Sequence, residues 1–288
     1  MNIVKLTSIF LLVGVTACGG GGSDSTAPIV VTIIDVVNCE EVACEDSHKF
    51  VIEQIYVDVI NGLNSGLVPS LYTEDFIQKN TNITAGISGQ TAYFDRLSTE
   101  NPNHVATIKH IVADGDYVAV HWHYSDTPEN EFSASAKVDL YKLIDNKIVE
   151  QWYFSMNSTT NTASGNSVFS DLYDYTDKQP NNDVAIEEEN KIMIADFYTT
   201  AFNTQNLTLI EEQVDVNYIQ HNPFVRNGRA GLSEYIESGF APTNVTIFMT
   251  LAEDDMVWTF RSDARVVDLW RVDNNKTSNK IVEHWDIF

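Results

Sequence analysis

The chain has 288 residues, of which 43% are hydrophobic, and a formal net charge of −24 at neutral pH. This length allows one large or two small domains, and the hydrophobic fraction is enough for a packed core. The charge argues strongly against nucleic-acid binding, since a polyanion would be repelled, and it disfavours binding to an anionic membrane surface.

The first residues have the pattern of an export signal. Lys5 precedes an apolar run of about ten residues that is too short to span a bilayer as a mature helix. Small residues precede Cys18, and a Gly/Ser-rich stretch typical of a flexible tether follows it. Residues 1–17 resemble a bacterial lipoprotein signal peptide, which implies lipid on Cys18; an ordinary signal peptide with a chance cysteine is the alternative. Because residue 19 is glycine, the resemblance favours the outer membrane of the cell envelope, where several acyl chains would form a stable anchor.

Two further cysteines, Cys39 and Cys44, lie in the tether predicted over residues 18–46. A close pair in an oxidising envelope compartment predicts a disulfide that closes a small loop. The spacing does not suit a paired zinc knuckle, and no other cysteine is near.

The rest of the chain contains an internal repeat. At an offset of 142 residues, Tyr56, Asn61, Ile77, Gln78, Gly89 and Tyr93 match Tyr198, Asn203, Ile219, Gln220, Gly231 and Tyr235. Farther on, Asp116 matches Asp255, Val138–Leu140 matches Val267–Leu269, and Ile148–Trp152 largely matches Ile281–Trp285. The repeat predicts two domains, over residues 47–158 and 186–288, joined by a polar linker over 159–185.

Each copy has the same order of expected elements. Apolar residues near helical spacing open it: Phe50, Ile52, Ile55, Val59 and Leu63 in the first copy, and Ile194, Phe197, Ala201 and Phe202 in the second. A short helix or turn follows, then a second helix, then three or four long strands. In the first copy these strands cover residues 105–112, 117–124, 132–143 and 148–155; in the second they cover 245–251, 256–261, 264–272 and 281–287. Helices followed by an antiparallel meander predict an α+β fold.

Four segments of the second copy resemble the SnoaL-like family of the nuclear-transport-factor-2-like superfamily. These segments are Tyr218–Pro223, Gly228–Leu232, Val267–Arg271 and Lys280–Asp286. The first copy is similar to the family more weakly, through Tyr117–His123 and Lys147–Trp152. The resemblance implies two tandem cone-shaped α+β barrels, each a curved sheet around helices with an apolar pocket. It also implies aldol-type ring closure without a metal or cofactor, as in the founding members.

The closing strand carries the main candidate residues. Its alternation places His284 and Asp286 on one face, whereas the first copy has Gln151 and Tyr153 there. A carboxylate in an apolar pocket suits a base, because burial raises its pKa toward the working pH. The resemblance therefore favours Asp286 as the base, with His284 and His221 as proton donors or orienting groups. Alternatively, His284 and Asp286 form a solvated outward pair, and His221 bonds to the backbone near a turn.

Other residues are candidates for ligand binding. In the second copy these are Tyr218, Trp270 and Arg229, expected in the pocket or at its rim. In the first copy they are His121 and His123, which share a strand face. Two histidines at this spacing can bind a metal, and His104 or His110 could supply a third ligand. The favoured interpretation is that His121 and His123 are pocket or surface residues, so no metal is predicted. The first copy is interpreted as catalytically degenerate and the second as partial.

Two functions follow from these patterns. The first is cofactor-free acid/base catalysis, an aldol condensation or isomerisation, on a small apolar carbonyl compound in the second domain of an envelope lipoprotein. The second is a non-catalytic envelope protein that binds an apolar ligand or a protein partner. The two copies could also pack as a pseudo-dimer within the chain through their sheets.

Overall fold

The computed structural model describes residues 42–174, 183–263, 265–274 and 279–288. The predicted signal peptide, Cys18 and Cys39 lie outside these residues. Cys44 takes part in a disulfide, but its predicted pairing with Cys39 falls outside the described part of the chain. Among the helices described, none combines the length and apolar character that a membrane span requires.

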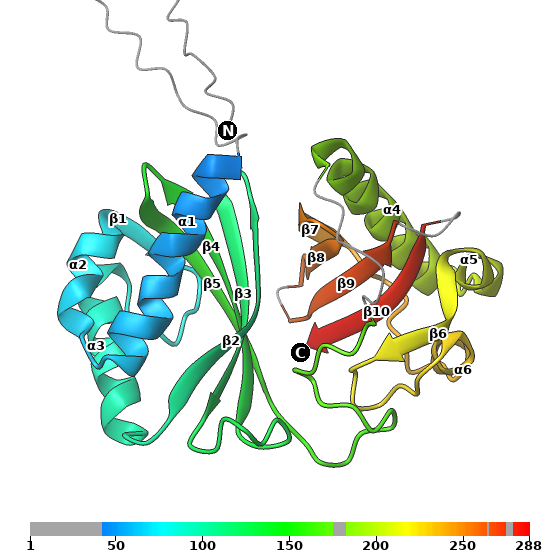
Figure 1. Cartoon of the computed structure of the whole chain (residues 1–288), viewed down its shortest axis with the longest axis horizontal. Coiled ribbons are helices and arrows are strands. Elements are labelled where there is room, and N and C mark those ends of the chain that lie inside the picture. The colour runs from blue at the N-terminus through cyan, green and yellow to red at the C-terminus, as the bar shows by residue number, and fades with distance from the viewer. Residues whose placement is uncertain (1–41, 175–182, 264, 275–278) are drawn as a thin grey trace, which may run out of the picture. The chain divides into compact units, whose positions relative to one another are not determined.

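Two five-stranded sheets with the same strand order form the two domains (Figure 1). The first domain contains α1 (Val42–Gln54), the π-helical η1 (Ile55–Asn61), the 3-10 turn η2 (Ser65–Leu67), α2 (Val68–Leu71), β1 (Tyr72–Gln78), α3 (Gly86–Glu100), β2 (Val105–Asp114), β3 (Tyr117–Ser125), β4 (Ser135–Ile144) and β5 (Lys147–Asn157). The second contains α4 (Val184–Asn203), α5 (Leu207–Gln213), β6 (Val214–Gln220), α6 (Arg229–Glu237), β7 (Ile247–Glu253), β8 (Met256–Arg261), β9 (Val267–Asp273) and β10 (Lys280–Ile287). The sheet orders are β1-β5-β4-β3-β2 and β6-β10-β9-β8-β7, so the predicted α+β class is confirmed.

One strand in each domain was not predicted. β1 and β6 pair in parallel with the closing strands β5 and β10, where the sequence predicts only a short helix or turn. In β1 only Tyr72 and Phe76 are buried, and acidic residues lie between them. The apolar alternation that identifies the other strands is therefore weak here.

The helical apolar face of the first copy was predicted wrongly at its two ends. Phe50 and Leu63 are each 62% exposed, whereas Ile52 and Ile55 are fully buried. Phe50 precedes Ile52 by only two residues, which places them about 200° apart around a helix. Leu63 follows the end of η1 at Asn61. In the second copy all four predicted residues are buried.

Each sheet has two apolar faces. One face packs against the helices of its own domain and forms that domain's core. The opposite faces contribute to a third cluster that joins both domains, with Val138 and Leu140 from β4 and Trp258, Leu269 and Trp285 from the second sheet. Burial of both faces explains why β3, β4, β9 and β10 are buried almost throughout.

Contacts between the domains occur in reciprocal pairs. Lys49 of the first domain forms an ion pair with Glu253 of the second, and Lys191 of the second pairs with Asp114 of the first at 2.7 Å. Each of these carboxylates also accepts a hydrogen bond from a backbone N–H of the opposite domain. Both lysines and both acids occupy equivalent positions of the repeat. Such reciprocity is typical of a two-fold interface, and we propose that the domains are related as the subunits of a fused dimer.

The polar segment expected to be a linker contains a packed stretch. Ser167, Val168 and Phe169 are 2–3% exposed, and the Phe169 ring lies against His121 and His123. Residues 167–169 therefore fill space between the sheets. The Ser- and Asn-rich composition of the segment does not predict this burial.

Glu283 of β10 is a buried acid with bonds from several segments of the second domain and the linker. It is fully buried and accepts hydrogen bonds from the backbone N–H groups of Leu172 and Tyr173 at 2.9 and 3.2 Å. It also accepts hydrogen bonds from the Arg271 guanidinium and from His221 Nε2 at 2.8 Å. This carboxylate thereby connects residues 172 and 173 to the second sheet.

Substitution of Glu283 tests this role. Glu283→Ala is expected to lower the free energy of unfolding by about 3 to 5 kcal/mol, because Arg271 would lose one of its acidic partners and the buried His221 and two backbone N–H groups would lose their acceptor. The matched control is Glu150→Ala on β5, since Glu150 occupies the same repeat position and pairs with the half-exposed Lys79. This control should cost about 1 kcal/mol or less. Equal losses in denaturant titrations would contradict the assignment.

Candidate functional site

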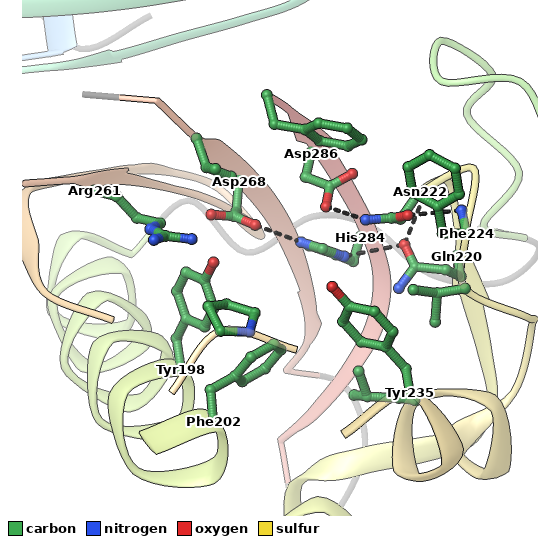
Figure 2. A pocket seen from close by; sticks show the side chains of 15 residues that line it. Tyr198, Phe202, Gln220, Asn222, Phe224, Tyr235, Arg261, Asp268, His284 and Asp286 are labelled. Carbon is green, nitrogen blue, oxygen red and sulfur yellow. Dashed lines mark hydrogen bonds and ion pairs between the residues drawn. The ribbon is translucent and has the colours of Figure 1, made fainter. Parts of the chain in front are cut away.

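A pocket of about 290 Å³ opens in the second domain (Figure 2). Its apolar wall contains Phe202, Phe224, Val225, Leu232, Pro242, Val266 and Phe288. Its polar lining comprises Tyr198, Gln220, Asn222, Tyr235, Arg261, Asp268, His284 and Asp286. Apolar walls with a few convergent polar groups are characteristic of small-molecule sites.

Adjacent strands position the three ionisable groups at the polar end. Asp286 of β10 pairs directly with Asp268 of β9 in the antiparallel register. His284 lies two residues before Asp286 and therefore on the same face of the sheet. The three side chains are at most 7% exposed. Two buried carboxylates placed opposite each other repel strongly unless at least one is protonated.

Gln220 fixes the orientation of the imidazole. Its Oε1 accepts backbone hydrogen bonds from His221 and Asn222 at 2.9 and 2.8 Å, so this atom must be the oxygen. His284 Nδ1 lies 3.1 Å from the same Oε1 and must therefore donate a proton to it. In a neutral ring this leaves a lone pair on His284 Nε2, which lies 3.1 Å from Asp268 Oδ1.

The proton between His284 and Asp268 belongs on the carboxyl group. Burial raises the pKa of Asp268 to about 8, and burial lowers the pKa of His284 to about 4. At neutral pH the pair is then a carboxylic acid that donates to a neutral imidazole. Because the two groups are coupled, these titrations belong to the pair rather than to either side chain.

Asp286 has a different environment. Asn222 Nδ2 donates to its Oδ2 at 2.5 Å, while its buried Oδ1 has no hydrogen-bond partner within the described residues. Burial raises the pKa of Asp286 to about 7. Asp286 thus presents a free lone pair inside the pocket and titrates near neutral pH.

Two tyrosines and an arginine complete the polar lining. Figure 2 shows the hydroxyls of Tyr198 and Tyr235 directed toward the three ionisable groups. Burial raises the pKa of both phenols, so they remain donors. Arg261 lines the pocket and forms an ion pair with Asp263 at 2.6 Å. These groups can donate hydrogen bonds to an oxygen atom that enters the pocket.

The same three side chains could geometrically share a cation. Asp268, His284 and Asp286 each offer one ligand atom, and these atoms lie within 4.8 Å of one another. Within the described residues, His284 donates to Gln220 and Asn222 donates to Asp286 Oδ2, while Asp286 Oδ1 has no hydrogen-bond partner.

The predicted site residues separate into two groups in the structure. His284 and Asp286 line the pocket, as the proposed catalytic roles require. Trp270 stacks on His284 with 3.9 Å between ring centroids, and Tyr218 lies beside His284 and accepts from Gln220. Both support the imidazole from the core without lining the pocket. Arg229 is farther away and donates to the carbonyl of Glu211.

His221 lies on the other face of the sheet. Its ring stacks on Trp285, its Nδ1 is 2.6 Å from the carbonyl of Ser167, and its Nε2 is bonded to Glu283. Both ring nitrogens therefore face oxygen atoms of neighbouring segments. The structure thus places His221 in the domain interface and away from the pocket.

His121 and His123 are also interface residues. Both side chains are fully buried. His121 Nδ1 lies 3.1 Å from His110 Nδ1, and His123 Nε2 contacts the carbonyl of Ser133 at 2.9 Å. They pack against Phe169 between the sheets, so neither points into the helix-lined interior of its own domain.

In the first domain, the acid that corresponds to Asp268 is surrounded by hydrogen-bond donors. Asp139, the repeat equivalent of Asp268, accepts from Gln151 at 2.8 Å, from Tyr56 at 3.0 Å and from the Trp122 indole at 2.7 Å. Both carboxylate oxygens are therefore bonded. Burial raises the pKa of Asp139 to about 6, but neither of its oxygens lacks a partner as Asp286 Oδ1 does.

Several pocket residues were not singled out from the sequence. These are Asp268, Gln220, Asn222, Tyr198 and Tyr235. Each has an identical partner in the first copy, namely Asp139, Gln78, Asn80, Tyr56 and Tyr93. The signal was therefore present in the repeat, where these identities were used only for alignment.

The comparisons with known proteins concern one domain. The model of the family described as SnoaL-like polyketide cyclase matches residues 50–162. The match thus falls on the first domain, although the sequence motifs favour the second. With the shared strand order of both sheets, it confirms the predicted nuclear-transport-factor-2-like α+β fold. Curated protein sequences give no match to the chain.

Solved structures resemble about two fifths of the chain. A SnoaL-like polyketide cyclase from Agrobacterium tumefaciens is 14% identical, with a TM-score of 0.33, and the match covers 38% of this chain and 91% of that one. An NTF2-like protein of unknown function from Mesorhizobium loti is 17% identical, with a TM-score of 0.33, covering 39% and 93%. TsrD from Streptomyces laurentii is 14% identical, with a TM-score of 0.32, covering 38% and 88%.

The buried acid pair predicts a pH-dependent stability. The pKa of Asp268 is raised in the folded protein from 3.8 to about 8. The stability that the protonated side chain contributes is therefore fully present below pH 4 and is lost as the pH rises to about 8. Asp268→Asn removes this titration while keeping a donor toward His284. The free energy of unfolding of the Asp268→Asn variant minus that of the wild type should therefore increase with pH, by up to about 1.4 kcal/mol per pH unit. Denaturant titrations at several pH values between 5 and 8 measure the difference; parallel profiles would contradict it.

Proposed function

We propose that the second domain catalyses a cofactor-free proton transfer at carbon, as in an aldol condensation or isomerisation of an apolar carbonyl compound. The observation that carries this proposal is the free Oδ1 of Asp286, buried beside a neutral Asp268–His284 pair. Base and acid thus lie on adjacent strands and face one apolar pocket.

Asp286 is the proposed base. With a pKa of about 7, a substantial fraction of the group is ionised at neutral pH, and the conjugate acid can still return the proton. Asn222 holds one carboxylate oxygen and leaves the other directed at the substrate. The carboxylate removes a proton from the carbon next to the carbonyl, which leaves an enolate.

Tyr198 and Tyr235 are the proposed stabilisers of that enolate, because their hydroxyls point toward the acid groups. A hydroxyl that burial keeps protonated can donate a hydrogen bond to the developing oxyanion. The proton of Asp268 is already donated to His284 Nε2, so Asp268 contributes by remaining uncharged beside Asp286. The enolate carbon then attacks a second carbonyl in a condensation, or takes the proton back from Asp286 at another carbon in an isomerisation.

The family match supports the class of chemistry, because its description names polyketide cyclases. The match lies on the first domain, in which Gln151 and Tyr153 replace His284 and Asp286. The second domain retains both ionisable groups, so we assign the activity there.

Deuterium exchange tests the proton-transfer step without a known substrate. Wild-type protein in D₂O should accelerate deuterium incorporation next to the carbonyl of methyl alkyl ketones, followed by NMR. Asp286→Asn is expected to reduce the rate by about 10²- to 10⁴-fold, since the amide cannot accept the proton. The rate should rise with pH through about 7, as Asp286 ionises, and fall above about 8, as Asp268 loses its proton.

The control variant is Glu150→Gln, an acid-to-amide change on β5 of the first domain, which should keep the wild-type rate. If ketones bind but Asp286→Asn exchanges as fast as the wild type, the second domain is a binding domain without this catalysis.

We also propose that the protein is an envelope lipoprotein anchored through Cys18. The support is the apolar run and the Gly/Ser-rich stretch on either side of this cysteine. In a bacterial host, the wild type should fractionate with the outer membrane and incorporate labelled palmitate. Cys18→Ser should appear in the soluble fraction without label. A Cys18→Ser variant that remains with the membrane would rule out this anchor.

A further inference from the structure

A second, larger cavity of about 570 Å³ adjoins the catalytic pocket. This outer groove is formed by α6 and its flanking loops. Its lining residues are Phe224, Val225, Arg226, Gly231, Glu234, Tyr235, Ser238 and Phe240.

The pocket and the outer groove share part of their walls. Phe224, Val225 and Tyr235 line both cavities. Tyr235 stands on α6 with its hydroxyl directed toward the acid groups of the pocket (Figure 2). A molecule that extends out of the pocket past Tyr235 would therefore enter the groove.

The outer groove is apolar with a polar edge. Phe224 and Phe240 are 72% and 85% exposed, so each leaves a large ring surface in water. At the edge, Arg226 forms an ion pair with Glu234. Single exposed apolar residues are common on proteins, but two phenylalanines lining one cavity beside a buried site favour a ligand-binding surface.

The inner pocket is small for a whole ligand. Its 290 Å³ is at the lower end of the range of about 300 to 1,000 Å³ for small-molecule sites. It suits the carbonyl-bearing end of a molecule, and the outer groove suits the remainder.

The pocket also selects by charge. An anionic group beside Asp286 would meet repulsion once this acid ionises, and Arg261, which lines the pocket, is already paired with Asp263. Burial of an unpaired charge is costly. The reactive end is therefore not anionic.

We propose that the substrate is an elongated carbonyl compound without an anionic group at its reactive end, whose carbonyl lies at Asp286 and Asp268 and whose apolar arm lies in the outer groove against Phe224 and Phe240. This inference rests on the proposed function for the position of the carbonyl. It replaces the small compound expected from the sequence by a longer, two-part molecule.

A series of methyl n-alkyl ketones from 2-butanone to 2-decanone tests the inference by calorimetry on the full chain. Each methylene that enters an apolar site contributes up to about 0.8 kcal/mol, or up to roughly fourfold in affinity. Affinity in the wild type should continue to increase through 2-decanone. Phe240→Asp places a carboxylate in the groove and should lower the affinity for 2-decanone about tenfold or more, while the affinity for 2-butanone is unchanged.

The matched control is Phe50→Asp, because Phe50 is also an exposed phenylalanine but lies on α1 of the first domain. It should bind every ketone as the wild type does. A plateau of wild-type affinity at the short ketones, or equal binding of 2-decanone by both variants, would overturn the inference.

These outcomes are independent of turnover. A chain-length dependence abolished by Phe240→Asp but without deuterium exchange leaves the groove assignment standing and removes the catalytic proposal. Deuterium exchange without a chain-length dependence of ketone affinity supports the catalytic proposal and removes the groove assignment.

Discussion

The alternation of side chains along β10 is the constraint on which both the site and the domain arrangement depend. In an extended strand, successive residues point to opposite faces of the sheet. His284 and Asp286 therefore face the pocket, while Glu283 and Trp285 face the first domain. A shift of one residue in the pairing of β10 with β9 would exchange these two sets. Residues of the inter-domain contact thus hold the register that keeps the acids in the pocket.

Burial has opposite consequences on the two faces of this strand. Toward the first domain, Glu283 is surrounded by donors that include Arg271 and backbone N–H groups. Toward the pocket, Asp268 and Asp286 have few donors, so burial favours their protonated forms and raises their pKa values. Proteins commonly retain such unfavourable groups where activity requires them. On this one strand, Glu283 has donors at both carboxylate oxygens and stabilises the structure, whereas Asp286 has an unbonded oxygen and is the proposed base.

The sequence was sufficient for the α+β class and for four of the five strands of each sheet, because its repeat and its alternating strands are local patterns; it missed β1 and β6, which pair in parallel with distant closing strands. It also identified His284 and Asp286, since their shared face follows from strand geometry alone. It could not show that His121, His123 and His221 face a second sheet, because what covers a strand face depends on distant segments. Asp268 and Gln220 could have been recognised, as both recur in the first copy. Their importance arises from Gln220 orienting the imidazole toward Asp268, a relation across three strands that no single segment contains.

The two domains of this chain are no longer equivalent, although their repeat and their reciprocal ion pairs relate them closely. In the first, Gln151, Tyr56 and Trp122 saturate the acid at the centre of the fold; in the second, the corresponding position opens into a pocket. A symmetric homodimer could not diverge in this way, because every substitution in its gene alters both subunits at once. Covalent joining frees each half to change separately. One half can then serve as a rigid partner, while its twin tolerates the buried acids that a reactive centre needs.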